Sequence, residues 1–152
     1  MKQEEITKIV NKVYPLIIQD IIINSDCKIK NVYPEVEFYK NIYERLGGIP
    51  AEGEDKAFAE YSWDTNKIYL YTNHMNSEED VIRSLIHECV HSKQCYEVYE
   101  AYYECDLDYE THPYEIEAEH EEEKWEKYKN LKEFDEWMDA LGEKEWIYRI
   151  LK

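Results

Sequence analysis

The chain has 152 residues, a length that fits one domain with one sizeable core and excludes two comfortable ones. Its formal net charge of −17 would repel nucleic acid phosphates and anionic lipid, and the sequence has no locally basic patch to overcome that repulsion. We therefore expect a solubilising acidic surface, with no nucleic-acid partner and no membrane partner.

The cysteine pattern and the first residues favour a cytoplasmic protein. The four cysteines form no CxxC pair, so free thiols are expected. Residues 1–5 do not read as a signal peptide, and the longest apolar run, residues 16–23, is too short to span a bilayer. A reducing compartment is the better expectation.

The N-terminal third reads as mostly helical. Residues 3–14 carry apolar side chains at helical spacing, and Pro15 bends or ends that helix. Residues 16–23 either continue as a helical turn or form a short strand, and residues 24–26 read as a turn. Residues 33–46 predict a second helix, because their apolar positions recur three or four apart.

A hairpin is expected next, after a polar loop over residues 49–56. Residues 57–63 and 67–71 alternate apolar and polar side chains on either side of Asp64-Thr65-Asn66. This pattern predicts a small antiparallel sheet.

The third predicted helix begins near Ser77, which is a good N-cap with Asp80 three residues later. Five apolar residues form one buried stripe along it: Val81, Ile82, Leu85, Ile86 and Cys89. The stripe leaves His87 and His91 together on a neighbouring face.

These histidines belong to an HExxH motif, the only recognisable catalytic chemistry in the chain. Residues four apart lie one turn above each other, so His87 and His91 can bind one metal ion while Glu88 lies beside them. Because catalytic zinc usually takes three protein ligands, the chain must supply another.

A later segment offers that ligand. Pro113 stands where the first position of a helix is expected, and Glu115 and Glu119 would share one face of the helix that follows. A helix crossing the HExxH helix could bring Glu115 to the metal.

HExxHxxQ at residues 87–94 and ExEAE at residues 115–119 together resemble the gluzincin type of zinc metallopeptidase, which includes the thermolysin-like and ImmA/IrrE-like enzymes. The resemblance covers roughly residues 57–125. It implies one Zn²⁺ per chain, held by His87, His91 and Glu115, with Glu119 orienting the first histidine although that position is often Asp. It also implies that strand 67–71 is a sheet edge that aligns an extended substrate, with an ordinary edge or buried strand as the alternative.

The expected fold is therefore α+β and zincin-like, mostly helical with a small antiparallel sheet beside the HExxH helix. One domain would span residues 1–152, comprising an N-terminal helical part at 1–56, the hairpin and two motif helices at 57–125, and C-terminal helices at 126–152. In the C-terminal part, aromatic and aliphatic residues recur at helical spacing from Trp125 to Leu141, and Gly142 marks a break. Such a stripe is usually core; a partner-docking face or a lid is the alternative.

The expected function is zinc-dependent hydrolysis of peptide bonds in a protein or peptide substrate. Zinc would activate a water and polarise the scissile carbonyl, and Glu88 would act as general base. His112 and Tyr109 are candidates for stabilising the oxyanion, as are Tyr96 and His74, although each also has a structural reading. The alternative function is a non-catalytic acidic binding protein on the same scaffold, such as an inhibitor or a DNA mimic. The sequence leaves the substrate and the oligomeric state open.

Overall fold

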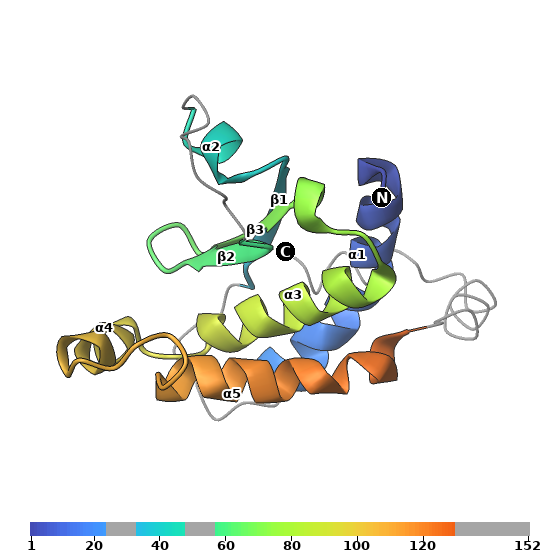
Figure 1. Ribbon diagram of the computed structural model, residues 1–152. Helices are drawn as coiled ribbons and strands as arrows, with labels where there is room; N and C mark the ends of the chain where they lie inside the picture. The colour runs from blue at the N-terminus through green and yellow to red at the C-terminus, as the bar shows by residue number, and fades with distance from the viewer. Residues whose placement is uncertain (24–32, 48–56, 130–152) are drawn as a thin grey trace.

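The computed structural model of the chain describes residues 1–23, 33–47 and 57–129. These residues form a mostly helical fold around one central helix, α3 (Glu78–Ser92), with a three-stranded sheet on one side of it (Figure 1). Helix α5 (Pro113–Glu122) runs alongside α3, and α1 (Gln3–Ile17) packs against α3 as well. The expectation of a mostly helical chain with a small sheet is confirmed.

The first helix is longer than the sequence predicts. Pro15 lies inside α1 and is buried there, and the chain continues into the π-helical segment η1 (Ile18–Ile23). Proline removes one backbone hydrogen bond from a helix, and here it does so without ending the helix. The alternative left open for residues 16–23 is therefore settled in favour of a helical conformation.

The helix predicted over residues 33–46 is wrong for most of its length. Glu35–Tyr39 form strand β1, which pairs in parallel with β3 (Lys67–Tyr71). The ladder is reinforced by an ion pair of 2.6 Å between Lys67 Nζ and Glu37 Oε1. Only a single turn, α2 (Ile42–Arg45), is helical.

The strand order is β1-β3-β2, and β2 (Ala59–Ser62) runs antiparallel to β3. The predicted hairpin is thus confirmed, but the sheet is mixed because β1 joins β3 in parallel. Strand β3 is paired on both sides, so the expectation that residues 67–71 form a substrate-binding edge is wrong. The strand that packs beside α3 at the edge of the described sheet is β2.

The start and the buried face of α3 agree with the sequence analysis. The Ser77 hydroxyl accepts a hydrogen bond of 3.2 Å from the backbone N–H of Asp80, and the Asp80 carboxylate accepts one of 2.9 Å from Asn76. All five residues of the predicted stripe are at most 1% exposed: Val81, Ile82, Leu85, Ile86 and Cys89. Together with α1 and β3, they form the core.

The remaining elements lie on either side of α3 in the chain. A 3₁₀ turn, η2 (Thr72–His74), precedes α3, and α4 (Tyr96–Glu104) follows it in a segment for which no helix is predicted above. Helix α5 begins at Pro113 as predicted, and η3 (Glu123–Tyr128) follows it. The predicted turn at 24–26, the loop at 49–56 and the C-terminal helices beyond residue 129 lie outside the described residues.

Two further observations concern thiols and membranes. Cys89, Cys95 and Cys105 are free, as expected, and Cys89 is buried. Among the helices that the structure describes, none combines the length and apolar character that a bilayer crossing requires.

Candidate metal centre

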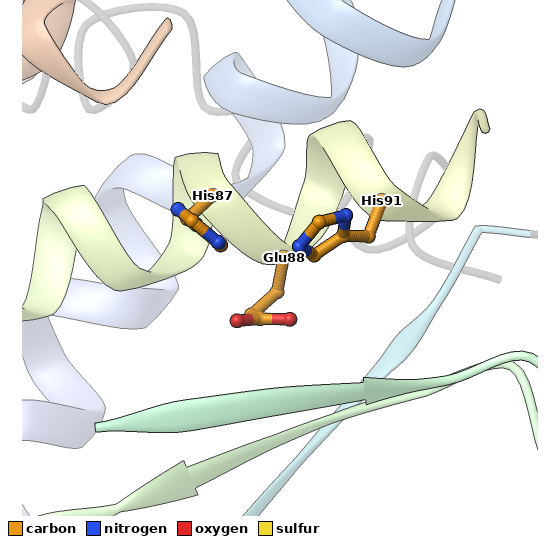
Figure 2. A group of neighbouring side chains, drawn as sticks. All are labelled: His87, Glu88 and His91. Carbon is orange, nitrogen blue, oxygen red and sulfur yellow. The ribbon is translucent and has the colours of Figure 1, made fainter. Parts of the chain in front are cut away.

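Figure 2 shows Glu88 pointing from α3 toward the strands, with His87 and His91 on either side of it along the helix. One ligand atom from each of His87, Glu88 and His91 lies within 4.8 Å of the others, so this cluster can hold a metal ion. The apolar stripe of α3 fixes this orientation, because burying that stripe against α1 and the sheet turns the neighbouring face toward β2.

Glu115 approaches the two histidines from α5. Its side chain is almost completely buried, with Oε2 3.0 Å from His87 Nε2 and Oε1 3.1 Å from His91 Nε2. Helices α3 and α5 pack along each other, and this packing brings together residues far apart in sequence. All three predicted metal ligands therefore meet at one point.

The donor types of this set are ones that zinc accepts. Two imidazole nitrogens and one carboxylate form a common catalytic zinc shell that leaves one position open. With zinc–ligand bonds of about 2.0–2.1 Å, donors at tetrahedral positions are roughly 3.3 Å apart. The N–O distances of 3.0 and 3.1 Å, each to a different oxygen of Glu115, are close to that separation.

Both histidines have a second partner that orients the ring. His87 Nδ1 lies 2.9 Å from Glu122 Oε2, and His91 Nδ1 lies 2.7 Å from Gln94 Oε1. Gln94 is itself held in place, because its amide donates to the carbonyl of Tyr114. Outer partners of this kind fix the tautomer of a ligating histidine and leave Nε2 to face the metal.

The residue that meets His87 Nδ1 is Glu122, whereas the resemblance implied Glu119. Glu119 is exposed and lines the cleft beside the cluster. The two residues lie near each other on α5, but Glu122 is nearly two turns beyond Glu115, at the level of the far side of the His87 ring. Sequence reasoning missed Glu122, although it lies in the run of three glutamates that ends the helix.

Tyr99 is a second residue that sequence reasoning missed. Its hydroxyl donates a hydrogen bond of 2.6 Å to Glu115 Oε1, which leaves the Glu115 carboxylate in contact with three side chains. Tyr99 comes from α4, and its tyrosine neighbours at helical spacing, Tyr102 and Tyr103, were the available signal for that helix.

His112, a candidate oxyanion stabiliser, is instead the cap of α5. It is fully buried, its Nδ1 accepts a hydrogen bond from the backbone N–H of Tyr114, and its Nε2 lies 2.9 Å from the carbonyl of Tyr99. Because backbone groups engage both ring nitrogens, neither is left for a substrate oxygen.

Of the other three candidate oxyanion stabilisers, two line the cleft and one does not. Tyr109 is about half exposed, lines the cleft and lies close to Glu115. Tyr96 also lines the cleft, at the end near His91. His74 stacks on Phe58 with ring centroids 6.1 Å apart, and it is not among the residues that line the cleft.

The ionisable side chains of the cluster shift one another's pKa values. Burial lowers the pKa of His87, but hydrogen bonds to Glu115 and Glu122 outweigh it and raise the pKa to about 10. Burial raises the pKa of Glu115, yet its hydrogen bonds to His87 and His91 hold it well below the usual value. Burial raises the pKa of Glu88, partly offset by the two nearby histidines.

The cluster forms one wall of a cleft of about 1020 Å³. Strand β2 and the hairpin turn form the opposite wall, and parts of α4 and α5 close the sides. This volume is ample for several residues of an extended peptide.

The chain matches no protein-family model, no curated protein and no solved structure. The case for a metal centre therefore rests on the identities of these side chains and the distances between them.

Proposed function

We propose that the chain is a zincin-type, zinc-dependent metallopeptidase that hydrolyses peptide bonds in a protein or peptide substrate. The observation that carries this proposal is the position of Glu115, whose carboxylate from α5 lies within 3.1 Å of both His87 Nε2 and His91 Nε2 of α3. An HExxH spacing alone is a short pattern, whereas a buried carboxylate on the same two nitrogens completes a catalytic zinc shell.

Each residue of the cluster has a distinct part in this proposal. His87, His91 and Glu115 would hold the ion. Zinc, when bound, supplies a Lewis acid that polarises a carbonyl and lowers the pKa of water. Glu88 takes a proton from the attacking water and passes it to the leaving amine. The raised pKa of Glu88 suits this task, because a more basic carboxylate accepts the proton more readily.

Strand β2 is the surface on which we expect the substrate backbone to lie. It is the outer strand on the cleft side of the described sheet, and Ala59, Glu60 and Ser62 line the cleft opposite Glu88. An extended peptide can add to such an edge through backbone hydrogen bonds, with alternate side chains pointing into the cleft.

Tyr109 is the best placed of the predicted oxyanion stabilisers. Partial burial, the charge of Glu115 and a hydrogen bond to Glu115 raise the pKa of Tyr109, so the phenol stays protonated. A donor on the cleft wall near Glu115 can stabilise the oxygen that becomes negative when the carbonyl is attacked.

The test is hydrolysis of a degenerate peptide mixture by the purified protein loaded with zinc. We expect the unchanged chain to cut peptides, and Glu88→Gln to lose at least about a hundredfold in rate while retaining zinc. Glu104→Gln, which makes the same charge change on exposed α4 outside the cleft, should keep full activity.

Two outcomes would contradict the proposal. Full activity in Glu88→Gln would exclude Glu88 as the general base. A protein that binds no zinc and cuts no peptide would favour the alternative of a non-catalytic acidic binding protein.

A further inference from the structure

The cleft has an aromatic wall at its His91 end. Trp63 follows β2, and its ring centroid lies 5.9 Å from that of His91 and 5.5 Å from that of Tyr96. The Trp63 indole N–H donates to the carbonyl of Gln94, which holds the ring in place. Tyr96 is 47% exposed, so part of this wall is open to a ligand.

Two carboxylates adjoin the wall. Asp64 is the next residue after Trp63 and is exposed, and Glu100 lies one turn after Tyr96 on α4. Asp64 lines the cleft together with Trp63 and Tyr96, and the charge of Glu100, and less strongly that of Asp64, raises the pKa of Tyr96. We call Trp63, Asp64, Tyr96 and Glu100 the aromatic subsite.

The rest of the cleft adds to the negative potential. Besides Asp64, seven carboxylate residues and two arginines line it. Both arginines are already paired, Arg45 with Glu60 at 2.8 Å and Arg83 with Glu122 at 3.6 Å. A low-dielectric cleft lined by one sign of charge concentrates ligands of the opposite sign.

Glu88 adds a buried carboxylate to the same cleft. Its side chain is only 7% exposed and points from α3 into the cleft (Figure 2). Among the described residues, the positive charges nearest its carboxylate are those of His87 and His91, and they only partly offset the effect of burial.

We infer that the aromatic subsite binds a lysine or arginine side chain of the peptide substrate. This inference rests on the proposed peptidase function and names its substrate class, which is basic peptides. A cation is attracted to the faces of Trp63 and Tyr96 and forms charge-assisted hydrogen bonds with Asp64 and Glu100. An apolar side chain would use the rings but would desolvate the carboxylates without pairing them.

The position of the subsite limits where the basic residue stands in the substrate. Trp63 contacts both His91 and Tyr96, so the subsite begins directly beside one metal ligand. Because an extended peptide advances about 3.3 Å per residue, the basic side chain belongs within about two residues of the scissile bond.

The test is to sequence the products of a randomised peptide library cut by the zinc-loaded protein. We expect lysine and arginine within two residues of the cut to be preferred over glutamine by about tenfold. Asp64→Asn should reduce this preference to below about threefold, and Glu104→Gln, the control outside the cleft, should retain it. A preference for leucine or phenylalanine, or no preference, would overturn the inference.

A binding measurement separates this inference from the proposed function. In Glu88→Gln, a fluorescein-labelled peptide of alternating lysine and alanine should bind at least about tenfold more tightly than its glutamine counterpart, and Asp64→Asn should weaken that binding. If no peptide is cut but this difference is present, the subsite stands and the peptidase proposal fails. Equal binding of the two peptides would overturn the subsite, whether or not peptides are cut.

Discussion

Replacing Tyr99 by phenylalanine tests whether α4 contributes to the metal centre. The change removes the hydroxyl that donates 2.6 Å to Glu115 Oε1 but keeps the ring, which packs 5.0 Å from Trp63 and 4.3 Å from His112 between centroids. A hydrogen bond to a charged group contributes about 1.5–3 kcal/mol. Partners of metal ligands typically change metal affinity by about 10–100-fold. We therefore expect zinc affinity to fall by about tenfold, which corresponds to about 1.4 kcal/mol.

The assay is competition for zinc between the metal-free protein and a chromogenic chelator. Tyr102→Phe is the matched control, because it makes the same change on the same helix at a ring that packs on His112 and Tyr114. A zinc affinity of Tyr99→Phe within about twofold of the unchanged protein would refute the reasoning that Tyr99 positions Glu115.

Three further predictions concern the same cluster and the helix that carries it. Glu122→Gln should weaken zinc binding by about tenfold while Glu119→Gln leaves it unchanged, as measured by the same competition. The reverse order would restore the role that the family resemblance implies for Glu119. Because the pKa of His87 is raised to about 10, its contribution to the stability of the metal-free protein is present below about pH 6.5 and is lost as pH rises through 10. Between about pH 6.5 and 10, the unchanged metal-free protein should therefore lose more thermal stability than the metal-free His87→Gln variant. Equal losses in the two proteins would exclude the raised pKa of His87. Leu85→Ala should cost about 2–5 kcal/mol in denaturant unfolding, because Leu85 is fully buried in the α3 stripe; a loss below about 1 kcal/mol would contradict its core position.

Helix α3 was predictable because its signals are local. Ser77 caps the helix within a few residues, and the apolar stripe repeats with the helical period along the same segment. The face that carries His87 and His91 follows directly from that stripe. Neither feature depends on another part of the chain.

Strand β1 was mispredicted because its apolar residues fit two periods. Val36, Tyr39 and Ile42 recur three apart, but Val36 and Phe38 also alternate as in a strand. The strand forms because its backbone pairs with β3, some thirty positions later in the chain. Local periodicity gives no information about which strand β1 pairs with, or about the strand order that places β3 in the centre.

Glu115 could be predicted from local sequence signals, whereas its neighbours Glu122 and Tyr99 could not. Glu115 was predictable because Pro113 marks the start of its helix and the motif spacing resembles that of the gluzincins. Glu122 and Tyr99 act through the packing of α5 and α4 against α3, which the sequence does not specify. Helix α4 also lacks a side-chain N-cap at Cys95, so its start had no local signal.

The most direct test of the proposed centre is the zinc content of the purified protein and of Glu115→Ala. We expect about one zinc ion per chain in the unchanged protein after dialysis against a weak chelator, and a large loss of zinc from Glu115→Ala under the same conditions. Glu119→Ala should retain the metal. This control shows whether zinc is lost from Glu115→Ala because a ligand is missing or because a negative charge is missing. A protein that takes up no zinc, or a Glu115→Ala variant that binds zinc as tightly as the unchanged chain, would contradict the assignment of His87, His91 and Glu115 as the zinc ligands.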